Sequence, residues 1–144
     1  MADDQSIRDL EREMGVLVRR IRRVIAERAR LVHPTLAPVG YSLLVALQDT
    51  GAHRASELGE TFSIDKGAVS RQVSALLDLG LIERRPDPDD RRAALLQITA
   101  EGTRRLEAVS AERRREVKDR LDGWTDAEVR DLVAALGRYN AALE

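Results

Sequence analysis

The sequence predicts a mainly α-helical fold with one small β-hairpin (α+β). Hydrophobic residues make up 43% of the 144 positions while aromatic residues make up only 3%, so the core must be aliphatic. Apolar residues recur at three- and four-residue spacing along most of the chain, which is typical of amphipathic helices. Two short β-prone segments flank one charged turn near residue 90. The length fits one domain, or one domain with appended helices.

Residues 6–31 predict one long helix whose start Ser6 or Asp9 could cap. Its apolar positions alternate by three and four: Ile7, Leu10, Met14, Leu17, Ile21 and Val24. Such a narrow stripe fits either a core helix or a helix at a dimer interface. Arginines crowd the second half, at Arg19, Arg20, Arg22, Arg23, Arg28 and Arg30. They indicate a solvated face or an accessory contact to DNA or to an anionic ligand.

Residues 33–62 predict a loop and two short helices. Pro34 and Pro38 mark the loop, and Pro38 suits the first turn of a buried helix over 41–47. A very short strand at 53–54 then precedes a helix over 56–62 that Ser56 would cap. Gly59 lies inside this helix, which indicates close packing against a neighbour because glycine otherwise destabilises a helix interior.

Residues 63–81 predict the second helix of a helix-turn-helix, capped by Ser63 or Asp65 and ended by Gly80. Its apolar positions, Val69, Val73, Leu76 and Leu77, share one face. The remaining face is small, hydrogen-bonding and cationic: Lys66, Gly67, Ser70, Arg71, Ser74 and Ala75. A helix that enters the major groove of DNA needs such a face.

The next segment predicts two strands, over 81–85 and 93–99, joined by the charged tip PDPDDRR at residues 86–92. A hairpin directly after a helix-turn-helix is a wing, whose arginine can enter the minor groove of DNA. We expect Asp90 to pair with Arg92 and to orient it, since residues two apart share one side of a strand. The alternative is an ordinary solvated hairpin turn.

The remaining chain predicts two helices, one capped by Thr99 and running to about residue 122, the other opened by a Thr125–Glu128 capping box. The last helix carries an apolar face of Val129, Leu132, Val133, Leu136, Tyr139 and Leu143. Pairing the terminal helices with a second copy would bury such stripes. We therefore expect residues 1–35 and 100–144 to form a dimerisation region and residues 36–99 to form the winged helix-turn-helix.

Composition restricts the function. The net charge is −1, and residues 63–92 are also neutral, which counts against DNA binding unless the cations face outward. This neutrality leaves open an alternative, a winged-helix protein-interaction module that does not bind DNA. No cysteine is present, which excludes disulfides and thiol chemistry. We find no nucleophile–base pair, phosphate loop or metal-ligand spacing, so we expect neither catalytic residues nor a metal or other cofactor.

The N-terminal sequence MADDQSIRDLERE is charged and has no signal-peptide-like apolar region. No apolar run approaches the roughly 20 residues that span a bilayer. We therefore expect a cytoplasmic protein without a membrane partner.

With these features the sequence resembles the MarR family of bacterial winged-helix transcription regulators. The segment that carries the resemblance is ASELGETFSIDKGAVSRQVSALLDLGLIERRPDPDDRRAALLQITAEG, residues 55–102. Its wing matches the family's D-x-R motif, which continues to L-T and E-G: Asp90, Arg91, Arg92, Leu96, Ile98, Thr99, Glu101 and Gly102. Ile98 replaces the usual leucine.

The resemblance implies a homodimer that binds double-stranded DNA at a pseudo-palindromic operator, as a sequence-specific regulator and most simply a repressor. It places six residues of the recognition helix toward the major groove: Asp65, Lys66, Ala68, Ser70, Arg71 and Ser74. In the wing it implies DNA contacts by Arg92 and Arg91, with Asp90 beside them. Ala68 stands where the family often has Ser or Thr.

The resemblance also implies a small-molecule effector, because many members respond to small anionic or phenolic ligands bound between the dimerisation helices and the winged helix. Arg22, His33 and Tyr41 are the candidates to line such a cleft. Thiol sensing, which other members use, is excluded here by the absence of cysteine.

Overall fold

The computed structural model describes residue 1 and residues 3–143, and its elements follow the predicted order. They are α1 (Asp4–Val32), α2 (Pro38–Thr50), α3 (Ala55–Phe62), α4 (Lys66–Asp78), β1 (Ile82–Pro86), β2 (Ala94–Ile98), α5 (Ala100–Arg120) and α6 (Asp126–Ala141). The mainly helical fold with one hairpin is thus confirmed. The chain forms two compact units, which divide after Val109 within α5.

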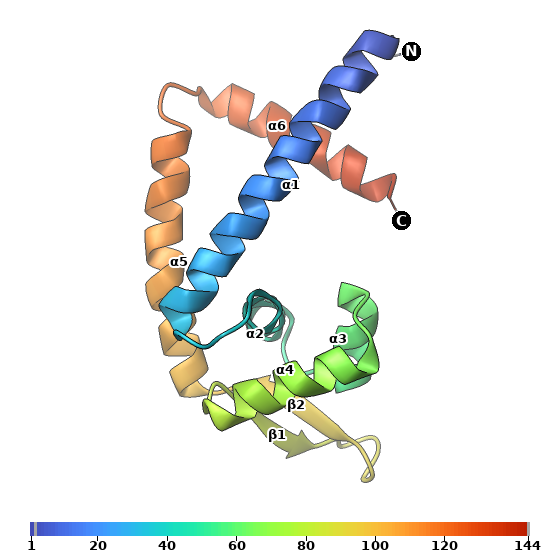
Figure 1. Ribbon diagram of the computed structural model, residues 1–144, viewed down its shortest axis with the longest axis vertical. Helices are drawn as coiled ribbons and strands as arrows, with labels where there is room; N and C mark the ends of the chain where they lie inside the picture. Colours follow the sequence, from blue (N-terminus) through green and yellow to red (C-terminus); the bar gives the residue numbers. More distant parts are fainter. Residues whose placement is uncertain (2, 144) are drawn as a thin grey trace. The chain divides into compact units, whose positions relative to one another are not determined.

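Helix α2 lies at the centre of the first unit. It packs against α1, α4 and β2, and Figure 1 shows it between α1 and the α4–hairpin layer. Leu43, Leu44 and Leu47 of α2 meet Leu76 of α4 and Leu81 in a core from which solvent is almost excluded. Burial of each leucine contributes about 1.5–3 kcal/mol, so this core holds the helix-turn-helix and the hairpin on one support.

The capping residues of α1 and α3 differ from those predicted. Asp3, not Ser6 or Asp9, caps α1, and its Oδ1 accepts from the backbone N–H of Ser6 at 2.7 Å. Ser56 does not cap α3, because the helix begins one residue earlier, with Arg54 at the capping position. There the Glu57 carboxylate accepts from the Arg54 N–H at 2.8 Å. An acidic side chain in the first turn therefore accepts from the N–H of the capping residue.

The hairpin pairs β1 with β2 in antiparallel register, from Ile82 opposite Ile98 to Pro86 opposite Ala94. His53 forms an isolated bridge with Leu96, with N···O distances of 3.1 and 2.8 Å. In place of the short strand predicted at 53–54, this single bridging residue joins the hairpin to the helix-turn-helix.

Helix α5 begins directly against the base of this hairpin. The Thr99 hydroxyl donates to the Gly80 carbonyl at 2.7 Å and accepts from the Gly102 N–H at 3.1 Å, which confirms Thr99 as the cap. A Cβ at Gly102 would lie 2.3 Å from the Leu81 oxygen. Only glycine therefore allows the first turn of α5 to approach the strand so closely.

The second unit comprises the end of α5 and helix α6. The predicted capping box is confirmed: the Glu128 carboxylate accepts from the Thr125 N–H at 2.7 Å, and the Thr125 hydroxyl accepts from the Glu128 N–H. None of the described residues of α6 is buried. Its predicted apolar face is present but exposed, at Leu132, Val133, Leu136 and Tyr139.

Helix α1 in the first unit also exposes part of its apolar stripe, at Ile7, Leu10, Leu17 and Ile21. Among the residues that the structure describes, no helix combines the length and apolarity needed to cross a membrane.

Candidate nucleic-acid interface

The turn between α3 and α4 is compact. Ser63 adopts the left-handed conformation, with φ 50° and ψ 45°, and the Ile64 N–H donates to the Gly59 carbonyl at 2.9 Å. A Cβ at Gly59 would lie 3.3 Å from the Ile64 oxygen and 3.4 Å from Val69 Cγ2. The close packing predicted from Gly59 is therefore confirmed, and it sets the approach of the two helices.

Helix α4 is capped by Asp65 rather than Ser63. Asp65 Oδ1 accepts from the Ala68 N–H at 2.9 Å, so the carboxylate is directed at the helix backbone. Val69, Val73 and Leu76 are buried. The opposite face is open, as predicted: of the six candidates, Ala68 is half-buried, and the exposed ones are Asp65, Lys66, Ser70, Arg71 and Ser74.

The Arg71 side chain lies beside Gly67. A Cβ at Gly67 would lie 3.5 Å from Arg71 Nη1 and 3.2 Å from Asp65 Oδ1. The guanidinium of Arg71 thus lies back along α4 toward the helix N-terminus, where backbone N–H groups also face outward. This places its charge at the end of the helix that would enter a groove first.

The wing tip differs from the predicted extended strand. Asp90 Oδ1 accepts from the backbone N–H of Arg92 at 3.0 Å, and the Asp90 carbonyl accepts from the Ala93 N–H at 2.9 Å. The contact between Asp90 and Arg92 therefore involves the backbone, and the prediction that the carboxylate orients the guanidinium is wrong. The reason is local: a turn brings the N–H group within reach. Arg91 and Arg92 are exposed.

A second carboxylate, which the sequence analysis missed, joins the wing to α3. Asp87 is 5% exposed, and its Oδ2 accepts from Arg54 Nε at 2.7 Å and contacts Arg54 Nη2 at 2.5 Å. Its Oδ1 accepts from the Asp89 N–H at 2.9 Å. The Asp89 N–H and then the Arg54 guanidinium lower the pKa of Asp87. Asp87-Pro-Asp is typical of a local turn, but nothing in the sequence indicates a partner 33 residues away.

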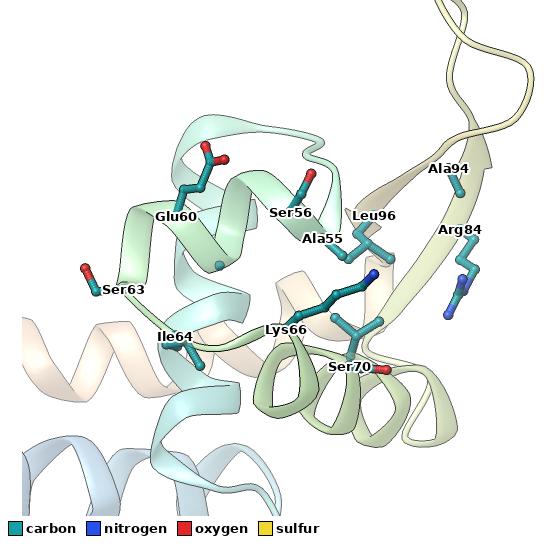
Figure 2. Close-up of a pocket in the computed structure, with 12 residues that line it drawn as sticks. Ala55, Ser56, Glu60, Ser63, Ile64, Lys66, Ser70, Arg84, Ala94 and Leu96 are labelled. Atoms are coloured by element: carbon teal, nitrogen blue, oxygen red, sulfur yellow. The ribbon is translucent and has the colours of Figure 1, made fainter.

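A cleft of about 730 Å³ lies between α3, α4 and the hairpin. Ile64, Val73 and Leu96 contribute apolar surface to it, and Lys66, Ser70 and Arg84 contribute polar groups. In Figure 2 Lys66 extends over the cleft from the start of α4, and Arg84 extends from β1. Arg84 is absent from the predicted site because sequence analysis places it only in a strand. Its position adds a cation beside α4.

The three candidate effector residues have different environments in the structure. Arg22 lines a cleft of about 440 Å³ together with Ile25, Pro38, Val39, Ser42, Phe62 and Ile64. Tyr41 is 5% exposed and belongs to the core, whereas His33 follows α1 and its Nδ1 lies 2.9 Å from the Thr35 hydroxyl. Periodicity could not distinguish Tyr41, which faces the core, from a residue that faces a cleft. Ligand binding by these residues stays a prediction.

Together α3, α4 and the hairpin form a winged helix-turn-helix with exposed cations on the second helix and at the wing tip, which defines a class of DNA-binding proteins. Comparison with known proteins identifies the family. The MarR family model matches residues 36–94. The uncharacterized HTH-type transcriptional regulator YxaD of Bacillus subtilis is 31% identical over 142 residues, covering 99% of this chain and 98% of YxaD.

The multiple antibiotic resistance protein MarR of Salmonella typhimurium is 33% identical over 103 residues, which cover 68% of this chain and 72% of that protein. Among solved structures, RV1404 from Mycobacterium tuberculosis superposes with a TM-score of 0.79 at 23% identity, over 99% of this chain and 95% of that one. The chain belongs to the MarR family, whose members are transcription regulators that act through DNA binding and are not enzymes.

Proposed function

We propose that this protein is a sequence-specific repressor that binds a pseudo-palindromic operator in double-stranded DNA as a homodimer in the cytoplasm. One observation carries the proposal: three acids of the neutral segment 63–92 accept hydrogen bonds within the protein, whereas four of its cations are exposed. Asp65 caps α4, Asp87 binds Arg54, and Asp90 binds the backbone of Arg92. By contrast, the side chains of Lys66, Arg71, Arg91 and Arg92 are exposed.

This arrangement answers the objection raised by the net charge. A carboxylate that accepts hydrogen bonds from backbone N–H groups or from an arginine repels phosphate less than a free one. The cations remain available for phosphates and base edges. In the proposed complex the α4 residues Asp65, Lys66, Ala68, Ser70, Arg71 and Ser74 face the major groove, and the wing residues Asp90, Arg91 and Arg92 lie at the minor groove.

The proposed dimer is supported by the exposed apolar residues of α1 and α6. A second copy that covers these faces would make an isologous interface. The two-fold axis of such a dimer matches the symmetry of a palindromic operator, with half-sites about 34–36 Å apart.

The proposed repression follows from occupancy, because a dimer bound across a promoter excludes polymerase. We further propose release by a small anionic or phenolic effector at the Arg22 cleft, where the guanidinium would meet a carboxylate or phenolate and Phe62 would contact a ring. His33 and Tyr41 would then act on the effector only through the residues that line the cleft.

Selection of bound sequences from a random DNA library by the full chain tests the proposal. The selected site should be palindromic, and log K should fall with log salt by about 0.9 per phosphate contact. If no sequence is selected and the salt response is flat, the proposal fails in favour of a protein-interaction module.

Two variants test the site. Arg92→Ala should weaken operator binding while the dimer stays intact, and Arg71→Ala should relax base preference at a cost of roughly 1–3 kcal/mol for a bidentate contact. Arg114→Ala, an exposed arginine of α5, is the control and should bind like the parent. If the Arg92 and Arg71 variants behave like this control, the site assignment is wrong.

A further inference from the structure

Asp87 is the only buried charged side chain among residue 1 and residues 3–143. Its two oxygens serve different elements. Oδ2 accepts from the Arg54 guanidinium, and Oδ1 accepts from the Asp89 N–H inside the wing tip. A charge is buried at a cost that only good partners offset, so this carboxylate is committed to joining the two elements.

Arg54 is the residue that immediately precedes α3, and its neighbour His53 bridges β2 through Leu96. Asp87 immediately follows β1. The Arg54–Asp87 pair therefore connects the start of the helix-turn-helix to the outer end of the hairpin, beyond the last strand pair between Pro86 and Ala94.

The tip itself is held by backbone contacts that begin at Asp87. The Asp87 N–H donates to the Ala93 carbonyl at 3.3 Å, and the turn from Asp90 to Ala93 closes the loop that presents Arg91 and Arg92. The direction in which these two arginines leave the loop thus depends on where Asp87 is held.

We propose that Arg54 and Asp87 are positioning residues for DNA binding, which hold the wing tip so that Arg91 and Arg92 reach the minor groove while α4 occupies the major groove. This inference rests on the proposed function. It extends the DNA-binding machinery to two residues that need not touch DNA.

Whether one substitution weakens or strengthens DNA binding distinguishes this positioning role from a simple effect of charge. Removal of an acid near DNA should by charge alone strengthen binding, because phosphates repel carboxylates. If Asp87 holds the wing, Asp87→Asn should instead weaken binding. We expect a loss of about tenfold, as for one charge-assisted hydrogen bond. Asparagine keeps the shape and one acceptor oxygen, so the fold should persist.

The experiment measures operator affinity and hydroxyl-radical footprints for the full chain with Asp87→Asn, Arg54→Gln and the double variant. Both single variants should lose protection where the wing meets the flanking minor groove and keep protection at the site of α4. The double variant should bind no more weakly than the weaker single variant, because both changes break one contact. Arg92→Ala should add little loss in the Asp87→Asn background.

Glu83→Gln is the matched control, since Glu83 lies on the same hairpin and forms an exposed ion pair with Arg85 at 2.9 Å. It should bind as tightly as the parent or more tightly. Thermal unfolding and dimer mass verify the fold of each variant. If Asp87→Asn does not fold, Arg54→Lys, which keeps the charge but loses the two-pronged contact, must still lose the flanking footprint for the proposal to stand.

Three results would overturn the inference. The first is an Asp87→Asn variant that binds like Glu83→Gln. The second is a loss caused by Arg54→Gln alone, which would make Arg54 a direct DNA contact. A parent that selects no DNA sequence is the third, and it overturns the proposed function together with this inference.

Discussion

Helices α4 and α6 have similar sequence patterns and opposite environments. In α4 the apolar residues Val69, Val73 and Leu76 are 3%, 3% and 0% exposed. In α6 the apolar residues Leu132 and Val133 are 41% and 64% exposed, and no described residue of that helix is buried. Helical periodicity therefore identifies an apolar face but does not identify what covers it.

The difference has a physical cause. Helix α4 packs on α2, α3 and β1 within one compact unit, so its apolar face is removed from water when the chain folds. The face of α6 remains in water in a single chain, and exposed apolar area costs about 25 cal/mol per Å² relative to burial. A partner chain that covers the apolar face of α6 would remove this cost, which is the basis of the proposed dimer.

The largest effect is expected for substitutions that test whether the apolar face of α6 forms the dimer interface. Leu132→Asp with Leu136→Asp should weaken dimerisation by about 3–6 kcal/mol, because each leucine contributes about 1.5–3 kcal/mol on burial and a buried carboxylate adds a further cost. Analytical ultracentrifugation measures the change. Arg138→Asp introduces the same charge away from the apolar face and should leave the dimer intact; equal dissociation in both variants would contradict the assignment of this face.

The next largest effect is expected for a substitution that tests how much the buried apolar face of α4 stabilises the fold. Leu76→Ala removes a side chain that is 0% exposed and should lower the free energy of unfolding by about 2–5 kcal/mol, through lost burial and a cavity. Urea denaturation measures it. Both alanine substitutions are compared in a chain kept monomeric by dilution and by Leu132→Asp, where Leu136→Ala in α6 should cost much less than Leu76→Ala. If the two alanine substitutions cost the same there, α6 has an intrachain partner and the comparison fails.

The smallest effect concerns Glu101, which connects α5 to α1. Its carboxylate accepts from Arg104 and Arg105 at 2.6–2.8 Å, and Arg105 donates to the Val32 carbonyl at 3.1 Å. The Arg104 and then the Arg105 hydrogen bonds lower the pKa of Glu101 from 4.5 to about 2. Because Glu101 is 40% exposed, Glu101→Gln should lower the melting temperature only slightly at neutral pH.

This difference should depend on pH in one direction. Above pH 4.5 the carboxylate is ionised in both folded and unfolded chains, so its full stabilisation is present. As the pH falls from 4.5 to about 2 the unfolded chain takes up the proton first, and the parent should lose its advantage over Glu101→Gln. Thermal melts across this range measure the effect. Glu107→Gln is the exposed control, and a gap that widens in acid would refute the assignment.

Three of the local signals in the sequence were confirmed. Thr99 and the Thr125–Glu128 box cap their helices as predicted, and Gly59 marks the close approach of α3 and α4. The predictions failed where the backbone took a different local path. Ser56 is not the cap of α3, because the helix begins at Ala55. Asp90 binds a backbone N–H rather than a guanidinium, because the wing tip forms a turn.

Sequence patterns suffice to predict the order of helices and strands, the exposed cationic face of α4 and the wing motif, because periodicity, capping and turn chemistry act over a few residues. Which charged side chains form hydrogen bonds or ion pairs depends instead on the tertiary packing. The partner of Asp87 lies 33 residues away at Arg54, and Tyr41 proved to be a core residue. Such pairings depend on how α2, α3 and the hairpin pack, and pairwise contacts of this range leave no periodic signal in the chain.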